Sequence, residues 1–253
     1  METTERFTGR AEYYAQSRPG YPRQLFDFLR ERAGLGAGTV VADIGSGTGL
    51  SSAPFLEFGC RVYGVEPNAE MRAKAEKRLE GAPGFHSMDG RAEATGLGAE
   101  SVDLVTAMTA FHWFDVDAAR AEFTRILRPG GAVALVWNKR RMTSPLMAEY
   151  EEVVRLYGRD YKSGWGQDRR TPQHWSDLLF GSRPYGYASF ENLQKLDLAG
   201  LIGRLLSASY APLPDEPNHV AAVRRLTEAF VRYEQDGTVN IEYDTVLYYG
   251  ALS

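Results

Sequence analysis

The sequence is poor in cysteine, and this scarcity limits the kinds of protein that it can encode. Cys60 is the only cysteine among 253 residues, so the chain can form neither an internal disulfide framework nor a zinc site from its own cysteines. The four histidines, at positions 86, 112, 174 and 219, are scattered without the spacing of metal ligands. We therefore expect a cytoplasmic protein that holds no metal ion.

Long apolar runs and excess positive charge are also missing. No stretch approaches the roughly 18 to 20 apolar residues that cross a bilayer, and the N-terminus lacks an apolar signal core. The formal net charge is −4, and the only dense basic run is Lys139-Arg140-Arg141. A chain without a positive field is a poor binder of nucleic acid. We expect a small-molecule substrate, no nucleic-acid or membrane partner, and either a monomer or a homodimer.

What the chain does contain is an alternation of strand and helix signals. β-branched runs and short apolar stretches predict strands at 39–44, 61–65, 85–88, 101–108 and 132–137. Helical spacing predicts helices between them, with Asn68 and Asp115 as N-caps and with Pro129-Gly130-Gly131 ending the helix that Asp115 begins. Such alternation indicates an α/β fold with a doubly wound, mostly parallel sheet.

The regular alternation of strand and helix signals ends after residue 139. The range 140–185 contains Trp165, Trp175 and a predicted helix at 145–157, and we interpret it as an inserted helical cap over the substrate site. Further elements are predicted in the C-terminal part: a strand at 190–196, helices at 198–207 and 217–235, and an antiparallel C-terminal edge strand at 240–249. On the longer helix, four residues are expected to face inward: Val220, Val223, Leu226 and Phe230.

These signals predict a division of the chain into four parts. Residues 1–38 form an N-terminal lid and first helix, and residues 39–139 form the ligand-binding core. The cap follows at 140–185, and residues 186–253 supply the strands and helices that complete the sheet.

A glycine turn follows the first predicted strand. The run Gly45-Ser46-Gly47-Thr48-Gly49 can bring backbone amides close to a ligand. Its G-x-G-x-G spacing and the acidic Asp43 before it differ from the pyrophosphate-binding G-x-G-x-x-G of dinucleotide folds. Asp43 could accept hydrogen bonds from a cationic amino group, or it could cap backbone amides. Glu66 ends the next strand, where a carboxylate can accept from both hydroxyls of a ribose or can face solvent.

Five segments within residues 39–137 carry a family resemblance: VADIGSGTG, VYGVEPNAEM, GRAEATGL, FHWFD and LRPGGAVALVW. They resemble the successive motifs of the class I S-adenosylmethionine (SAM)-dependent methyltransferases. Within that superfamily the chain is similar to the methyltransferase type 11 family, the small-molecule branch with ubiquinone-biosynthesis and trans-aconitate methyltransferase relatives. The resemblance implies a Rossmann-like seven-stranded sheet, SAM as the cofactor, S-adenosylhomocysteine (SAH) as its product, and methylation of a small-molecule acceptor.

The resemblance also implies roles for single residues around the cofactor. The glycine turn would wrap the methionine part of SAM, with Asp43 near its amino group and Arg18 near its carboxylate. Glu66 would bind the ribose, Met71 would pack on the adenine, and the backbone of Ala92 would border the adenine edge. The full implied set is Asp43, Gly45, Ser46, Gly47, Gly49, Glu66, Pro67, Met71, Arg91, Ala92, Met108 and Arg18. Many family members carry an acid where Arg91 stands, which is a departure from the pattern.

On the substrate side, the resemblance places Met108 and residues 111–113 near the transferred methyl group. His112 is a candidate general base, with a structural hydrogen-bonding role as the alternative. Tyr14 is a second catalytic candidate, in a segment that either covers the cofactor or tethers the terminus. An aromatic cap that excludes water could include Tyr14, Trp113, Trp165 and Trp175. Two other functions stay open: a SAM-sensing or regulatory module without turnover, and an NAD-dependent oxidoreductase, which the glycine spacing disfavours.

Overall fold

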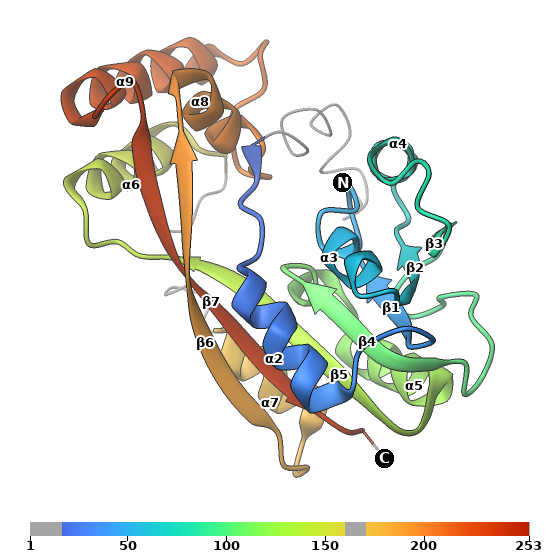
Figure 1. Cartoon of the computed structure of the whole chain (residues 1–253). Helices are drawn as coiled ribbons and strands as arrows, with labels where there is room; N and C mark the ends of the chain where they lie inside the picture. Colours follow the sequence, from blue (N-terminus) through green and yellow to red (C-terminus); the bar gives the residue numbers. More distant parts are fainter. Residues whose placement is uncertain (1–16, 160–170, 253) are drawn as a thin grey trace.

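A seven-stranded sheet forms the centre of the computed structural model, which describes residues 17–159 and 171–252 (Figure 1). The strand order is β3-β2-β1-β4-β5-β7-β6. The strand bounds are β1 Val40–Ile44, β2 Arg61–Val65, β3 Phe85–Met88, β4 Val102–Met108, β5 Leu127–Arg140, β6 Gly186–Leu196 and β7 Val239–Gly250. Neighbouring strands pair in parallel except where β7 joins β5 and β6. The expected doubly wound, mostly parallel sheet is confirmed.

The C-terminal strand is antiparallel as predicted, but it does not lie at the edge of the sheet. β7 pairs with β5 from Val133↔Gly250 onward and with β6 from Gly186↔Tyr249 onward, so β6 occupies the edge. β6 alternates between half-buried and exposed residues, whereas β7 contains a buried run around Val246. The alternation of apolar and polar residues along a strand shows which face of the sheet is covered. It does not show whether the strand pairs with one neighbouring strand or with two.

Helices cover both faces of the sheet. α2 (Arg23–Ala33) and α3 (Ser52–Glu57) pack on one face, where the rings of Phe26 and Phe55 lie 5.2 Å apart edge to face. α5 (Val116–Ile126) and α7 (Pro172–Phe180) pack on the other. Two clusters of buried apolar residues therefore lie on the two faces of the central strands, as β-branched strands buried on both faces require.

Local capping signals are confirmed at two helix starts. The Oδ1 of Asn68 accepts a hydrogen bond from the Met71 amide over 3.0 Å at the start of α4 (Ala69–Arg78). The Oδ1 of Asp115 accepts from the Ala118 amide over 3.1 Å at the start of α5. Both side chains satisfy amides that have no partner within the helix.

The end of α5 differs from the prediction. The helix stops at Ile126, and β5 begins at Leu127, so Pro129-Gly130-Gly131 lies inside the extended segment and does not precede it. Leu127 pairs with Val102, and the register shifts before Leu104 pairs with Ala132. The turn residues therefore form an irregularity in the strand, which proline and glycine tolerate where ladder hydrogen bonds are missing.

The range 140–185 is divided between two parts of the fold. α6 (Pro145–Tyr157) packs with α8 (Leu198–Leu206) and α9 (Pro217–Tyr233) in an apolar cluster (Figure 1). The cluster lies at the carboxyl end of β6 and the amino end of β7. α7 belongs instead to the main core, where Trp175 is buried against the sheet. The cluster therefore combines one helix that precedes β6 in the chain with two helices that follow it. α7 instead covers a face of the central sheet. Trp165 lies outside the described residues.

Of the four residues expected to face inward on α9, Leu226 and Phe230 are buried as predicted, whereas Val220 and Val223 are not among the buried residues. Val220 is 72% exposed, and the buried residues of the helix are Ala222, Leu226, Ala229 and Phe230. These residues keep the i, i+4, i+7, i+8 spacing of one helical face. The prediction favoured the bulkier valines, whereas two alanines face the neighbouring helices.

Candidate active site

The glycine turn lies between the end of β1 and the loop that follows β4. The amides of Gly45 and Ser46 both donate to the carbonyl of Val65, over 2.8 and 3.3 Å. Gly45 has φ +69°, and a Cβ atom there would lie 2.6 Å from the Cβ of Ala110. The close approach of two backbone segments therefore requires glycine at position 45.

Glu66 follows the last residue of β2 and faces the glycine turn. Its Oε2 accepts from the Gly47 amide over 3.1 Å, and its Oε1 accepts from the Asn68 amide over 2.9 Å. Burial raises the pKa of Glu66, although the two amides and the charge of Arg72 act in the opposite direction. Each carboxylate oxygen has a further lone pair, so Glu66 can still accept from hydroxyl groups of a ligand.

The larger cavity at this site has a volume of about 470 Å³, within the size range of small-molecule pockets. It brings together seven residues of the expected cofactor set: Gly45, Gly47, Glu66, Pro67, Met71, Arg91 and Ala92. Met71 and Ala92 supply a buried apolar wall, and Glu66 supplies the carboxylate. An apolar slot beside one anchored acid fits a nucleoside, since it offers a surface for the base and an acceptor for the ribose.

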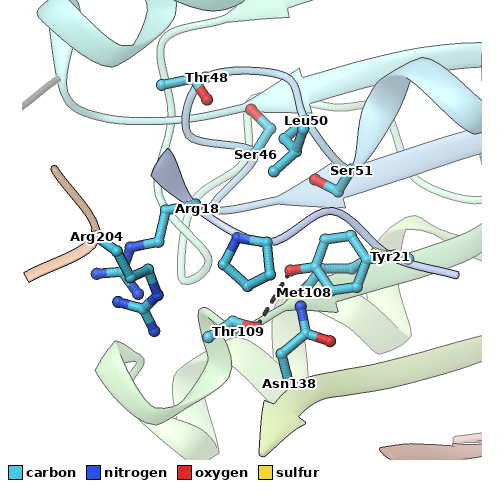
Figure 2. A pocket seen from close by; sticks show the side chains of 12 residues that line it. Arg18, Tyr21, Ser46, Thr48, Leu50, Ser51, Met108, Thr109, Asn138 and Arg204 are labelled. Atoms are coloured by element: carbon cyan, nitrogen blue, oxygen red, sulfur yellow. Dashed lines mark hydrogen bonds between the residues drawn. The ribbon is translucent and has the colours of Figure 1, made fainter. Parts of the chain in front are cut away.

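A smaller cavity of about 40 Å³ lies next to it (Figure 2). Four expected cofactor residues line this cavity: Gly45, which also lines the larger one, and Arg18, Ser46 and Met108. Gly45 and Thr109 belong to the walls of both cavities, so the two meet at the carboxyl ends of β1 and β4. This is the edge where doubly wound sheets bind their ligands.

Asp43 and Gly49 stand outside both cavity walls. The Asp43 carboxylate is fully buried and accepts from the hydroxyls of Ser51, Ser52 and Thr106, over 2.6, 2.7 and 3.1 Å. Burial raises its pKa, and the three hydroxyls partly offset this effect. Asp43 thus ties the start of α3 and the strand β4 to β1, and its partners are hydroxyls and not the backbone amides considered above.

The surroundings of His112 favour its structural role. Its Nδ1 accepts from the indole Nε1 of the buried Trp137 over 3.4 Å, and His112 lines neither cavity. Burial and the charge of Arg18 lower the pKa of His112 to about 4. An imidazole this weakly basic is a poor match for a general base at neutral pH. The other catalytic candidate, Tyr14, lies outside the described residues.

The other aromatic candidates are distributed differently from the prediction. Trp113 lines the larger cavity, on the nucleoside side of the site, whereas Phe111 is fully buried in the core. Trp175 packs edge to face on Phe111, with ring centroids 6.4 Å apart, and lines neither cavity. Trp175 is therefore a core residue and does not cap the site.

Four residues that line the smaller cavity were not expected from the sequence: Thr109, Tyr21, Asn138 and Arg204. Thr109 has φ +58°, a strained conformation for a β-branched residue, and such strain clusters at functional sites. Its position directly after the predicted strand 101–108 was the only sequence signal for it. Arg204 comes from α8, nearly 100 residues further along the chain, and no motif marks it.

Other kinds of site receive no support from the described residues. Within residues 17–159 and 171–252, no three histidine, cysteine or acidic side chains are grouped as metal ligands. In the same part of the chain, no helix has the length and apolar character to cross a membrane.

Comparison with known families and sequences identifies the part of the chain that holds most of the site. A family model described as "Methyltransferase domain" matches residues 42–135. An "uncharacterized methyltransferase" of Mycobacterium tuberculosis is 36% identical over 147 residues, which make up 58% of this chain and 56% of that protein. The chain thus spans little more than half the length of this relative. An "uncharacterized methyltransferase-like" protein of Schizosaccharomyces pombe is 25% identical over 239 residues, covering 93% of this chain and 91% of that protein.

Solved structures share the fold over nearly the whole chain. A protein of Anaeromyxobacter dehalogenans, assigned as a type II methyltransferase, has a TM-score of 0.65 and 26% identity, covering 93% of this chain and 98% of that one. A SAM-dependent methyltransferase of Geobacter sulfurreducens, solved with SAH, has a TM-score of 0.53 and 20% identity, with 97% of each chain covered. At this identity, the second likeness concerns the fold.

Proposed function

We propose that this chain, which carries the domain of the class I SAM-dependent methyltransferases and uses SAM as its cofactor, transfers a methyl group to a small-molecule acceptor. The observation that carries the proposal is the meeting of two cavities at Gly45 and Thr109. One cavity has the size and wall of a nucleoside site. The other opens beside it at the end of β4, where an acceptor would approach.

The residues that would hold SAM come from four segments: those that follow β1, β2 and β3, and the one that precedes α2. Glu66 would accept hydrogen bonds from the ribose hydroxyls, and Met71 and Ala92 would cover the adenine. The backbone between Gly45 and Gly47 would follow the methionine part toward the smaller cavity. Arg18 is held there by its Nη2 hydrogen bond to the Ser207 carbonyl over 2.9 Å, and it would meet the methionine carboxylate.

Bound SAM supplies a methyl carbon attached to a positively charged sulfur. In an in-line displacement, the acceptor's nucleophilic atom forms a bond to this carbon while the carbon–sulfur bond breaks and its electron pair stays on sulfur, which gives SAH. The protein's task is alignment, which is a large source of rate acceleration in reactions between two bound molecules. The ends of β1 and β4 suit this task because strand pairing holds them side by side, and His112 accepts a hydrogen bond from the buried Trp137.

Calorimetric titration tests the cofactor part of the proposal. SAM and SAH are expected to bind the wild type, whereas NAD is not. Glu66→Ala is expected to weaken the affinities for SAM and for SAH by about tenfold or more, because a charge-assisted hydrogen bond contributes about 1.5 to 3 kcal/mol. Glu80→Ala removes an exposed acid that lines neither cavity and should bind like the wild type. Absence of SAM binding, or a preference for NAD, would overturn the proposal.

Turnover requires a separate measurement. Release of SAH from SAM is followed over a panel of small acids, amines and phenols, because a sensing module would bind SAM and release no SAH with any of them. The sensing function is the alternative that an intact pocket leaves open. SAH release that depends on an acceptor and is lost in Glu66→Ala would decide in favour of the enzyme.

A further inference from the structure

The strand β6 forms one edge of the sheet and is long for an edge strand. It has eleven residues, and within the described part of the chain it pairs with β7 alone (Figure 1). The pairing runs from Gly186↔Tyr249 to Leu196↔Val239 without a register shift, and β6 contains no proline. Edge strands are commonly short or carry prolines or bulges, because an open edge can pair with a further strand. β6 has none of these three protections.

One face of β6 carries a row of exposed side chains. Residues alternate between half-buried and exposed along the strand, and the exposed row includes Glu191, Leu193 and Lys195. Leu193 is 59% exposed, which is a large fraction for a leucine in a strand. On the opposite face, Asn192 donates to the Gly20 carbonyl over 2.8 Å. The sheet is therefore fastened to the N-terminal segment on one face of β6, and the exposed row lies on the other.

The two charged residues of this row have opposite signs and stand symmetrically about Leu193. Glu191 comes two residues before Leu193, and Lys195 comes two residues after it. The Glu191 carboxylate contacts Arg141 over 3.1 Å, yet its side chain is 85% exposed and can meet a second cation. Charges on an edge strand usually keep copies of a protein apart. Here their order along the strand has the opposite effect on an antiparallel copy of β6.

This effect follows from the geometry of an antiparallel pair, in which directly opposite residues point to the same face. A twofold axis through Leu193, perpendicular to the sheet, sets Leu193 opposite Leu193 of a second copy. It also sets Glu191 opposite Lys195 on both sides of the axis, so each charge meets its opposite. A twofold axis through Glu191 would pair the strand over its whole length, but it would set two glutamates opposite each other, which is destabilising.

We propose that β6 pairs with β6 of a second copy of this chain, antiparallel and centred on Leu193, so that two sheets join into one. A twofold contact of one surface with itself is the commonest arrangement in soluble oligomers. Two paired strands bury little surface, and interfaces below about 1,200 Å² are weak, so we expect a dissociation constant in the micromolar range. The proposal does not depend on the proposed function, because Glu191, Leu193 and Lys195 line neither cavity of the site.

Sedimentation equilibrium of the full chain over the micromolar range tests for the dimer. Lys195→Glu sets two acids opposite each other on both sides of the axis, and it should weaken dimerisation by about tenfold or more. Glu191→Lys should have the same effect. The double variant Glu191→Lys/Lys195→Glu should recover much of the lost affinity, because each charge again meets its opposite. Lys77→Glu reverses an exposed charge on α4, beside β3 at the other edge of the sheet, and should dimerise like the wild type.

Disulfide formation tests the register. Opposite Cα atoms in an antiparallel pair lie about 4.5 to 5.5 Å apart, which a disulfide can span. Leu193→Cys should therefore give a covalent dimer with diamide, which takes up the two protons and two electrons of the thiols. In Glu191→Cys the two cysteines would lie about 13 Å apart along the strands, so this variant should give none. The wild type should also give none, because Cys60 is buried.

A wild type that stays monomeric at every concentration would overturn the proposal, and so would a dimer that neither charge reversal weakens. A covalent dimer of Glu191→Cys without one of Leu193→Cys would overturn the register centred on Leu193. A Tm close to that of the wild type shows that each variant is folded, which is expected because the substituted side chains are exposed.

Discussion

The hydroxyl of Tyr21 and the Oγ1 of Thr109 lie 3.2 Å apart, and this hydrogen bond joins the segment before α2 to the end of β4 (Figure 2). The same N-terminal segment is held elsewhere, since the Gly20 carbonyl accepts from Asn138 over 3.1 Å and from Asn192 over 2.8 Å. Residues 17–21 are therefore anchored across the strand ends, and Arg18 is fixed at the small cavity.

We expect this hydrogen bond to contribute about 0.5 to 1.5 kcal/mol to the free energy of unfolding. Tyr21→Phe and Thr109→Val each remove one partner, and urea unfolding of both single variants and the double variant gives their coupling energy. The double variant should be less destabilised than the sum of the singles. Strict additivity of the two effects would show that the two hydroxyls do not interact.

Gly45→Ala is expected to destabilise the chain by about 2 to 4 kcal/mol and to abolish SAH binding. A left-handed φ costs an alanine about 1 to 2 kcal/mol, and the contact with Ala110 adds an overpacking penalty. Gly81→Ala is the matched control, because Gly81 has φ +81° and no atom within 4 Å of a Cβ. It should show only the conformational cost and bind SAH normally. Equal losses of stability in both variants would argue against the steric contact.

The affinity for SAH should fall as the pH is lowered through the pKa of Glu66. This pKa is raised by burial, so the decline should begin above the ordinary value of 4.5. The ionised carboxylate accepts hydrogen bonds from the ribose, and protonation removes that capacity. Titration calorimetry across the acid range measures the profile. Glu66→Gln should bind weakly with little pH dependence, and a wild-type-like profile in this variant would assign the titration to another group.

Glu122 supplies a pH-dependent part of the stability of the loop beside the larger cavity. Its Oε1 accepts from the amide and the hydroxyl of Thr95, over 2.9 and 2.5 Å, and its hydrogen bonds to Arg125 are the main reason why its pKa falls to about 2. Because the folded-state pKa is depressed, this stabilisation is complete above about pH 4.5 and disappears as the pH falls toward 2.

Glu122→Gln should therefore lower the free energy of unfolding by about 1 to 2 kcal/mol at pH 7. This value is smaller than the pKa shift alone would give, because Arg125 is partly exposed and solvent screens its charge. Urea unfolding at pH 7 and at pH 3 measures the difference between variant and wild type. The difference should shrink at the lower pH. A difference that stays constant over this range would show that packing, and not charge, is responsible.

Local sequence signals were sufficient where a residue acts on its own neighbours. Asn68 and Asp115 cap helices because their side chains reach amides three residues away, and the β-branched runs became strands in their predicted places. The glycine turn and Glu66 were likewise predictable, since a turn after a strand has a fixed geometry and the end of the next parallel strand lies beside it.

Residues that act across long separations could not be predicted in the same way. Arg204 lies on α8, the helix that follows the edge strand β6. It reaches the cavity because β6 is held in the sheet by β7, which comes later in the chain. Asp43 had the expected position beside the turn, but its burial among three hydroxyls depends on β4, about 60 residues away. Hydrophobic periodicity describes the face on which a residue lies and carries no information about what covers that face.

The sequence by itself determined the alternation of strands and helices, the glycine turn and the acid that follows the second strand, because each depends on contacts within a few residues. Only the tertiary structure decided that β7 lies between β5 and β6, that α7 belongs to the core, and that Arg204 and Thr109 share one cavity. These features depend on strand pairing and helix packing between distant segments, which a linear pattern of residues does not specify.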